Sequence, residues 1–167
     1  MILVNTGNGK GKTTASVGLA IRALGQDLTV SFGQFMKRNE QAGEQKMLAR
    51  LLGDRFHAQG KGFLTRPEQF PSHRAAAETL IEWAAEQLEN ADMVILDEAL
   101  YALKSNLLQE DELRGLIAKA RERNIHLVLS GRGCPEWLAE EADLITEMTE
   151  IKHPYKQGIP AQKGIEF

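Results

Sequence analysis

A glycine-rich segment behind the first apolar residues constrains the fold of this chain more than any other feature. Residues 1–4 form a short apolar run, residues 6–13 read TGNGKGKT, and apolar residues then recur at helical spacing from Lys12 to Leu24. A Gly-Lys-Thr ending between a predicted strand and a predicted helix is the second half of the P-loop pattern. Thr6 departs from the first half, which has glycine at that position. The segment therefore predicts a loop that binds phosphate.

This loop is expected to hold phosphate with its backbone and with two side chains. Successive N–H groups face one anion at a helix N-terminus, where the helix dipole favours negative charge. Lys12 is expected to be exposed and to add positive charge, and the Thr13 hydroxyl is expected to bind magnesium. The alternative is a glycine-rich turn with two solvated lysines. The residues expected to bind the nucleotide are Gly7, Asn8, Gly9, Lys10, Gly11, Lys12, Thr13 and Thr14.

Strands and helices alternate along the rest of the chain, which predicts a doubly wound, mostly parallel α/β sheet with a P-loop nucleotide-binding fold. We expect a single domain over residues 1–167, with residues 152–167 as a tail over the surface and residues 53–71 irregular. The predicted strands are residues 1–4, 28–35, 93–96, 125–129 and 144–149. The predicted helices are residues 12–24, 44–52, 72–90 with Ser72 as N-cap, 112–123 and 135–141.

Two acidic residues follow the continuous apolar run at residues 93–96. Such a run is typical of a strand that is buried on both faces of a parallel sheet. Asp97 and Glu98 therefore stand at a strand end, where a P-loop fold needs a second group of polar side chains. Carboxylate oxygens suit magnesium, so we expect both residues to hold this ion, directly or through water. The alternative is a solvated strand end.

The composition excludes some classes of function. The chain has 20 Lys and Arg residues against 23 Asp and Glu, and the net charge of -3 gives no general attraction to nucleic acid or to anionic lipid. No apolar run approaches the length of a membrane span. The single cysteine, Cys134, is expected to be a small buried hydrophobe, and Trp83 and Trp137 are expected in the core. We expect a cytoplasmic protein without a nucleic-acid or membrane partner.

Several further segments, taken together and in order, resemble one known family. They are TGNGKGKTT at residues 6–14, QFMK at 34–37, GE at 43–44, GF at 62–63, VILDE at 94–98, SGRGC at 130–134, KH at 152–153 and AQKGIEF at 161–167. With these segments the chain resembles the P-loop type of ATP:corrinoid adenosyltransferase nearly from end to end.

The resemblance implies transfer of the 5′-deoxyadenosyl group from ATP to the Co(I) centre of a reduced corrinoid or cobalamin, with release of triphosphate. Members of this family bind ATP in reverse, with the γ-phosphate deep in the loop and the ribose toward the corrinoid. The implied cofactors are ATP and Mg²⁺, and the implied partners are the corrinoid substrate, an electron donor for cobalt and a second subunit of a homodimer.

The same resemblance assigns catalytic roles to Lys12, Thr13 and Glu98. Co(I) is itself a strong nucleophile, so the protein has to position the two reactants and stabilise the charge on the leaving triphosphate. Arg132 follows the strand at residues 125–129 and is expected to meet either phosphate or a corrin side chain.

Four more residues are expected to contact the corrinoid. Phe63 matches an aromatic residue that packs under the corrin ring and displaces its lower axial base, although Thr65 stands where some members have Trp. The alternative is that Phe63 anchors the loop or the core. Gln34, Lys37 and Glu44 follow the second strand on the side where open α/β sheets bind ligands, and each is otherwise an ordinary surface residue.

Two other functions remain open from the sequence. One is a P-loop kinase or NTP hydrolase of different specificity, in which Glu98 would orient a water molecule or a substrate hydroxyl. The other is a non-catalytic, nucleotide-dependent corrinoid-binding module. Because some family members carry an amino-terminal extension over the corrinoid, we expect any cover here to come from residues 56–71, from the tail or from a second subunit.

Overall fold

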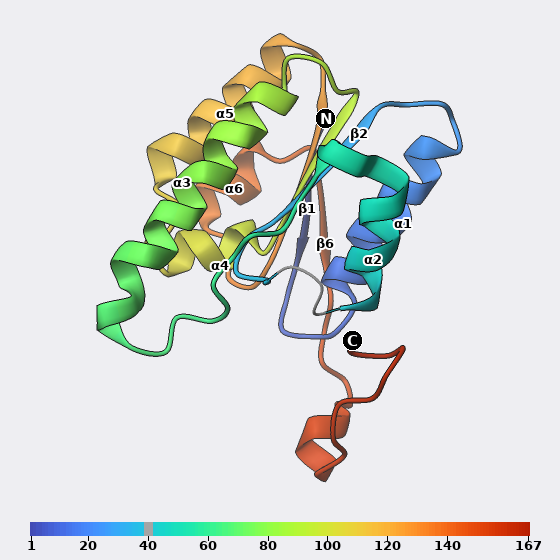
Figure 1. The fold of residues 1–167 in the computed structure, drawn as a ribbon, viewed down its shortest axis with the longest axis vertical. Helices are drawn as coiled ribbons and strands as arrows, with labels where there is room; N and C mark the ends of the chain where they lie inside the picture. Colours follow the sequence, from blue (N-terminus) through green and yellow to red (C-terminus); the bar gives the residue numbers. More distant parts are fainter. Residues whose placement is uncertain (39–41) are drawn as a thin grey trace.

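One six-stranded parallel sheet lies at the centre of the protein (Figure 1). The computed structural model describes residues 1–38 and 42–167. The strand order is β3-β2-β4-β5-β1-β6, and every pairing between described residues is parallel. The strands are β1 Ile2–Thr6, β2 Val30–Gln34, β3 Phe56–His57, β4 Met93–Asp97, β5 His126–Ser130 and β6 Leu144–Glu147.

Helices cover both faces of this sheet, which confirms the predicted doubly wound α/β fold (Figure 1). Helices α1 (Lys12–Leu24) and α2 (Gly43–Leu52) lie on one face. The helices on the other face are α3 Phe70–Gln87, α4 Ala99–Lys104, α5 Glu110–Glu122 and α6 Glu136–Glu141. Short 3₁₀ helices lie at Gly53–Arg55, Pro67–Gln69 and Pro154–Gln157.

The burial of strand β4 explains the continuous apolar run at residues 93–96. All five of its residues are buried. Val94 and Leu96 pack in the core on the α3 and α5 side, whereas Ile95 packs in the core on the α1 and α2 side. Because both faces of β4 pack against helices, polar and apolar residues do not alternate along the strand. The register then pairs Gln34 with Asp97, so the polar ends of β2 and β4 lie side by side.

Helix α3 begins earlier than the sequence predicted. It starts at Phe70 with Gln69 at the N-cap position, and Ser72 lies in its first turn, where its hydroxyl donates to the Gln69 carbonyl at 2.9 Å. Pro71 is tolerated there because the first turn leaves its N–H groups without helical partners. The prediction of Ser72 as the N-cap was therefore wrong.

Other expectations from the sequence need smaller corrections. The sequence analysis did not predict the helix α4 or the two-residue strand β3. Helix α4 is short, and Ala99, Leu100 and Ala102 are all buried, so its sequence shows no amphipathic pattern. Trp83 and Trp137 pack against the core but are only half-buried. No helix in the described ranges combines the length and the apolar character that crossing a membrane requires.

Candidate active site

The loop at residues 7–11 packs against the chain that follows β6. The Gly9 N–H donates to the Met148 carbonyl at 2.7 Å. A Cβ atom on Gly7 or Gly9 would lie 2.4 or 2.7 Å from the Met148 oxygen, and Gly7 also has a φ of 98°. Glycine is therefore required at these positions by the close approach of another backbone segment, as well as by the turn itself. No local sequence pattern indicates this contact, because Gly9 and Met148 lie far apart in the chain.

Lys12 is buried, whereas the sequence analysis expected it to be exposed. The residue is only 7% exposed, and its ammonium donates to the carbonyls of Gly7 and Gly9, each at 2.7 Å. Lys12 is enclosed because the loop folds around its ammonium. Burial lowers the pKa of Lys12, and the nearby charge of Arg132 acts in the same direction. A desolvated ammonium at the centre of the loop suits the binding of an anion.

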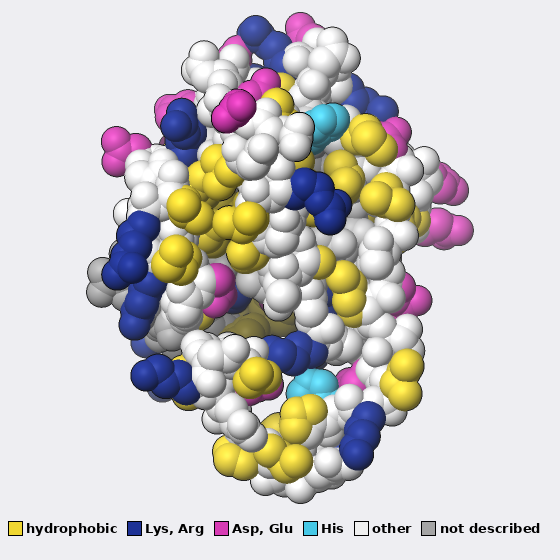
Figure 2. All heavy atoms as spheres, turned by 90° about the vertical axis from the view of Figure 1, so that its right-hand side faces the viewer, with side chains coloured by type: hydrophobic (Ala, Val, Ile, Leu, Met, Phe, Trp, Pro, Cys, Tyr) yellow, Lys and Arg dark blue, Asp and Glu magenta, His cyan; other side chains and the backbone are white. Residues whose placement is uncertain are grey.

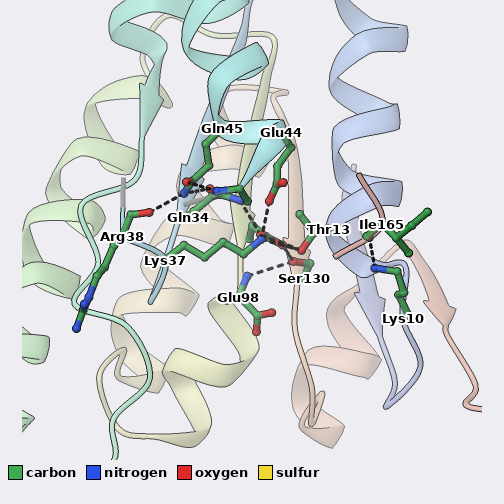
Figure 3. A network of polar contacts seen from close by, with 12 residues as sticks. Lys10, Thr13, Gln34, Lys37, Arg38, Glu44, Gln45, Glu98, Ser130 and Ile165 are labelled. Atoms are coloured by element: carbon green, nitrogen blue, oxygen red, sulfur yellow. Dashed lines mark hydrogen bonds and ion pairs between the residues drawn. The ribbon is translucent and has the colours of Figure 1, made fainter. Parts of the chain in front are cut away.

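A fully buried carboxylate lies beside this loop. Asp97 accepts hydrogen bonds from the Thr13 hydroxyl at 3.0 Å, from the Gln34 amide at 3.0 Å and from the Ser130 hydroxyl (Figure 3). These donors come from α1, β2 and β5. Asp97 thus ties the first turn of α1 to the ends of three neighbouring strands. Ser130 received no role from its sequence, although its place after an apolar strand marks it for this edge of the sheet.

Lys37 brings a positive charge to the same carboxylate. Its Nζ lies 3.1 Å from Asp97 Oδ2, 3.0 Å from Glu44 Oε1 and 3.3 Å from Thr13 Oγ1 (Figure 3). Burial alone would lower the pKa of Lys37, but the charges of Asp97 and Glu44 outweigh it and raise the pKa. Lys37 and Glu44, which the sequence analysis assigned to the corrinoid, therefore belong to the same group of contacting residues as Thr13 and Asp97.

Gln34 is buried among the partners of Asp97, whereas the sequence analysis expected it to contact the corrinoid. It has no exposed surface and is the last residue of strand β2. Its amide nitrogen donates to Asp97, and its amide oxygen accepts from Gln45 Nε2 at 2.9 Å. Gln45, which the sequence analysis did not select, also donates to the Arg38 carbonyl at 3.0 Å. Gln34 is thus a residue that orients Asp97.

Glu98 lies beside Asp97 in a different environment. It has a φ of 60°, which is uncommon for a residue other than glycine, and its N–H donates to Ser130 Oγ at 3.2 Å. Its carboxylate points away from the Lys37 ammonium in Figure 3. Burial and the charge of Asp97 raise the pKa of Glu98. Strained backbone and a raised carboxyl pKa are both features of functional sites.

The residues at this edge fit a magnesium ion chemically. The Thr13 hydroxyl donates its hydrogen to Asp97 and accepts from the Lys37 ammonium at 3.3 Å, which leaves one of its lone pairs for a metal ion. Glu98 supplies carboxylate oxygens, and Mg²⁺ is commonly held by one or two carboxylates with water in its remaining positions. Asp97 is enclosed by its own donors, which suits an indirect role better than direct ligation.

Phe63 is 66% exposed, so it does not anchor the core. Its ring meets Tyr101 edge to face, with the centroids 5.6 Å apart. The segment before it is attached to the chain after β2, since the N–H groups of Gly60 and Gly62 donate to the carbonyls of Lys37 and Met36 at 2.9 and 2.6 Å. This attachment holds an exposed aromatic ring near the carboxyl ends of the strands.

The remaining predicted residues lie around the loop. Asn8, Lys10 and Thr14 are exposed, as is Arg132 after β5. Thr65 is also exposed, and its hydroxyl hydrogen-bonds to Gln69 Oε1 at 3.1 Å. Cys134 is half-buried against the core, close to its expected character, and burial raises the pKa of its thiol.

The chain matches one protein family over its whole length. The family described as ATP:corrinoid adenosyltransferase BtuR/CobO/CobP matches residues 1–167. A corrinoid adenosyltransferase of Pseudomonas aeruginosa is 38% identical over 170 residues, and one of Sinorhizobium sp is 37% identical over 171 residues. A third, of Escherichia coli K12, is 34% identical over 170 residues. Each alignment covers 100% of this chain, and 83%, 80% and 85% of the respective relative.

A pair of glycine substitutions tests the close packing of the loop. Gly9→Ala should lower the free energy of unfolding by about 1–3 kcal/mol, as overpacking does, because the new methyl group meets the Met148 backbone. It should also weaken ATP binding. Gly115→Ala in α5 meets no atom within 4 Å and should instead stabilise by about 0.5–1 kcal/mol. Urea unfolding and ATP titration measure both effects, and a Gly9→Ala variant as stable as wild type contradicts the packing argument.

The raised pKa of Glu98 has a consequence for stability. A carboxyl whose pKa is higher in the folded than in the unfolded protein favours folding at low pH and opposes it as the pH rises through the folded value. Glu98→Gln should therefore raise the Tm at pH 8 without nucleotide and with EDTA, and the gain should shrink toward pH 4. Glu86→Gln, at an exposed position on α3, is the control. A Glu98→Gln variant with a Tm no higher than wild type at pH 8 is the contrary result.

Proposed function

The chain belongs to the ATP:corrinoid adenosyltransferase family, and on this basis we propose that it transfers the 5′-deoxyadenosyl group of ATP to the Co(I) centre of a reduced corrinoid. The observation that carries the proposal is the family match over all 167 residues. The phosphate loop with its buried lysine supports the same reaction, because the leaving group is a triphosphate.

The reaction needs no nucleophile from the protein. The electron pair of Co(I) attacks C5′ of the ribose, a cobalt–carbon bond forms, and the bond between C5′ and the α-phosphate oxygen breaks. That bonding pair leaves with the triphosphate, and cobalt becomes formally Co(III). The protein contributes by aligning cobalt, C5′ and the leaving oxygen and by stabilising the charge that develops on the triphosphate.

The contacts in the site support separate roles for the residues that bind phosphate, hold magnesium and orient other side chains. The N–H groups of the loop and the ammonium of Lys12 bind the triphosphate, and Arg132 adds positive charge beside them. Thr13 and Glu98 would hold Mg²⁺, which neutralises phosphate charge when it is bound. Asp97 acts through Thr13, which it orients by accepting the hydroxyl hydrogen. Gln34 and Ser130 fix Asp97 in turn.

The corrinoid is proposed to approach the exposed ring of Phe63. This ring lies on a segment that is hydrogen-bonded to the Lys37 backbone, while the Lys37 side chain contacts Asp97 and Glu44. Lys37 and Glu44 therefore stand between the nucleotide site and the corrinoid side, and we assign them to positioning at this boundary. A homodimer, an electron donor for cobalt and a cytoplasmic location remain predictions.

The identity of the phosphate product tests the proposed function. The protein is incubated with ATP, Mg²⁺ and chemically reduced cobalamin, and the phosphates are separated while the corrinoid spectrum is followed. We expect triphosphate and adenosylcobalamin in equal amounts, and Lys12→Ala should slow both by about 10²–10³-fold, the loss typical of one removed charge-stabilising donor. Lys46→Ala, at an exposed position on α2, should match wild type. ADP and orthophosphate formed at the same rate without corrinoid would support a kinase or hydrolase instead.

The proposed role of Phe63 predicts a dependence on how cobalt is reduced. If the ring displaces the lower axial base, it makes cobalt easier to reduce to Co(I). Phe63→Ala should then impair transfer to enzymatically reduced cobalamin far more than transfer to cobalamin that is already Co(I). Phe63→Tyr, which keeps the ring, serves as the control. Equal losses in the two assays would leave Phe63 with a packing role only.

A further inference from the structure

Phe63 is an exposed apolar residue with a defined ring contact. Figure 2 shows hydrophobic side chains on the face over α1 and α2, where Ile21, Met47 and Leu51 are each exposed by about half of their surface. Single apolar residues on helix surfaces are common and need no partner. The Phe63 ring instead lies on an irregular segment and meets the ring of Tyr101 on α4. This contact gives the exposed ring a preferred orientation.

The backbone before Phe63 is held by the chain that follows β2. A Cβ atom on Gly60 would lie 2.4 Å from the Met36 carbonyl carbon, so the two backbones are in direct contact there. Arg38 Nε donates to the Lys61 carbonyl at 3.0 Å. The freedom that remains to the Phe63 ring is therefore mainly rotation about its own side-chain bonds. An exposed aromatic side chain exchanges rapidly among staggered rotamers unless a neighbour favours one of them.

Tyr101 has a fixed position in the fold. It is half-buried and packs against the core. A Cβ atom on Gly131, directly after β5, would lie 3.0 Å from the Tyr101 backbone nitrogen, and Gly131 has a φ of 138°. Glycine at this position therefore lets the first turn of α4 approach the end of β5 closely. The Tyr101 ring can thus act as a support for the exposed ring of Phe63.

Helix α4 also connects Tyr101 to the proposed magnesium site. Glu98 is the N-cap of α4, and its carbonyl accepts from the Ala102 N–H at 3.0 Å, so Glu98 and Tyr101 belong to the same helical turn. The rings of Tyr101 and Phe63 meet at an interplanar angle of 82°, with their centroids 5.6 Å apart. This edge-to-face arrangement is a favoured geometry of aromatic pairs, and it leaves Phe63 66% exposed. The Phe63 ring thus keeps surface for a ligand while its orientation relative to Glu98 is set.

We propose that Tyr101 is a positioning residue, which holds the Phe63 ring in the orientation that meets the corrinoid. The inference rests on the proposed function, because it takes Phe63 as the residue that displaces the lower axial base. Attack of cobalt on C5′ requires that the corrinoid and the nucleotide meet in one relative orientation. The contact of Phe63 with Tyr101 supplies part of that orientation, because it joins the corrinoid surface to the turn of α4 that follows Glu98. Tyr101 acts through Phe63 and need not touch either substrate.

Substitutions at Tyr101 test the proposal with a spectroscopic readout. Tyr101→Leu keeps apolar bulk against the core but removes the ring, Tyr101→Phe keeps the ring, and Lys104→Ala, at an exposed position on α4, is the control. Each full-length variant is mixed with ATP, Mg²⁺ and Co(II) cobalamin. Electron paramagnetic resonance gives the ratio of base-free to base-bound Co(II), because the nitrogen of a bound base splits the cobalt signal. Tyr101→Leu should lower this ratio about 2- to 10-fold, the range that an aromatic pair supplies, while the other two variants match wild type.

A double-mutant cycle tests whether Tyr101 acts through Phe63. Once the Phe63 ring is removed, Tyr101→Leu should have no further effect, so Phe63→Ala and the double variant should give the same ratio. Transfer to cobalamin that is already Co(I) should stay close to the wild-type rate in Tyr101→Leu. In the protein without any substrate, a nuclear Overhauser effect between the two rings should report the contact itself.

Three results would overturn the inference. An unchanged ratio in Tyr101→Leu means that Tyr101 does not position Phe63. A further loss in the Phe63→Ala background means that Tyr101 acts on the corrinoid independently. An equal loss of transfer to cobalamin that is already Co(I) assigns Tyr101 a general packing role. If the variants behave as expected but the wild type forms ADP instead of triphosphate, the proposed transfer fails while the role of Tyr101 in corrinoid binding stands.

Discussion

The buried carboxylate of Asp97 is the interaction on which the rest of the site depends. An ionised carboxylate without exposed surface is costly unless it is paired and hydrogen-bonded. Here the partners are a lysine, two hydroxyls and an amide from α1, β2, β5 and the chain after β2. Because all of them must meet one group, the first turn of α1 and three strand ends hold a fixed relative position. The phosphate loop, which directly precedes that turn of α1, is positioned with them.

The same charge organises the electrostatics on both sides of the loop. Burial and the charge of Asp97 raise the pKa of Glu98, and the charges of Asp97 and Glu44 raise the pKa of Lys37 against the effect of burial. The Lys37 carbonyl also accepts a hydrogen bond from the Gly60 N–H, in the segment that leads to Phe63. Contiguous contacts thereby connect Thr13, proposed for the nucleotide, with Phe63, proposed for the corrinoid.

Local features of the sequence predicted much of this arrangement. The glycine-rich loop and the apolar run before Asp97 act over a few residues, and α1 has the bounds that its periodicity indicated. The burial of Lys12, the contact of Gly9 with Met148 and the return of the tail to Lys10 depend on segments far apart in the chain, so no local pattern reports them. The contact between Gln34 and Asp97 could be predicted in part, although the two residues are far apart in the chain. Both residues end apolar strands, and parallel pairing brings such ends together.

The most direct test of the account follows the bridging oxygen between C5′ and the α-phosphorus of ATP. ATP labelled with ¹⁸O at this position is allowed to react with the protein, Mg²⁺ and Co(I) cobalamin, and the products are analysed by mass spectrometry. Attack of cobalt on C5′ breaks the carbon–oxygen bond, so the account predicts that the label leaves in triphosphate. Label that remains attached to the nucleoside, in ADP or AMP, would contradict adenosyl transfer and place the reaction at phosphorus.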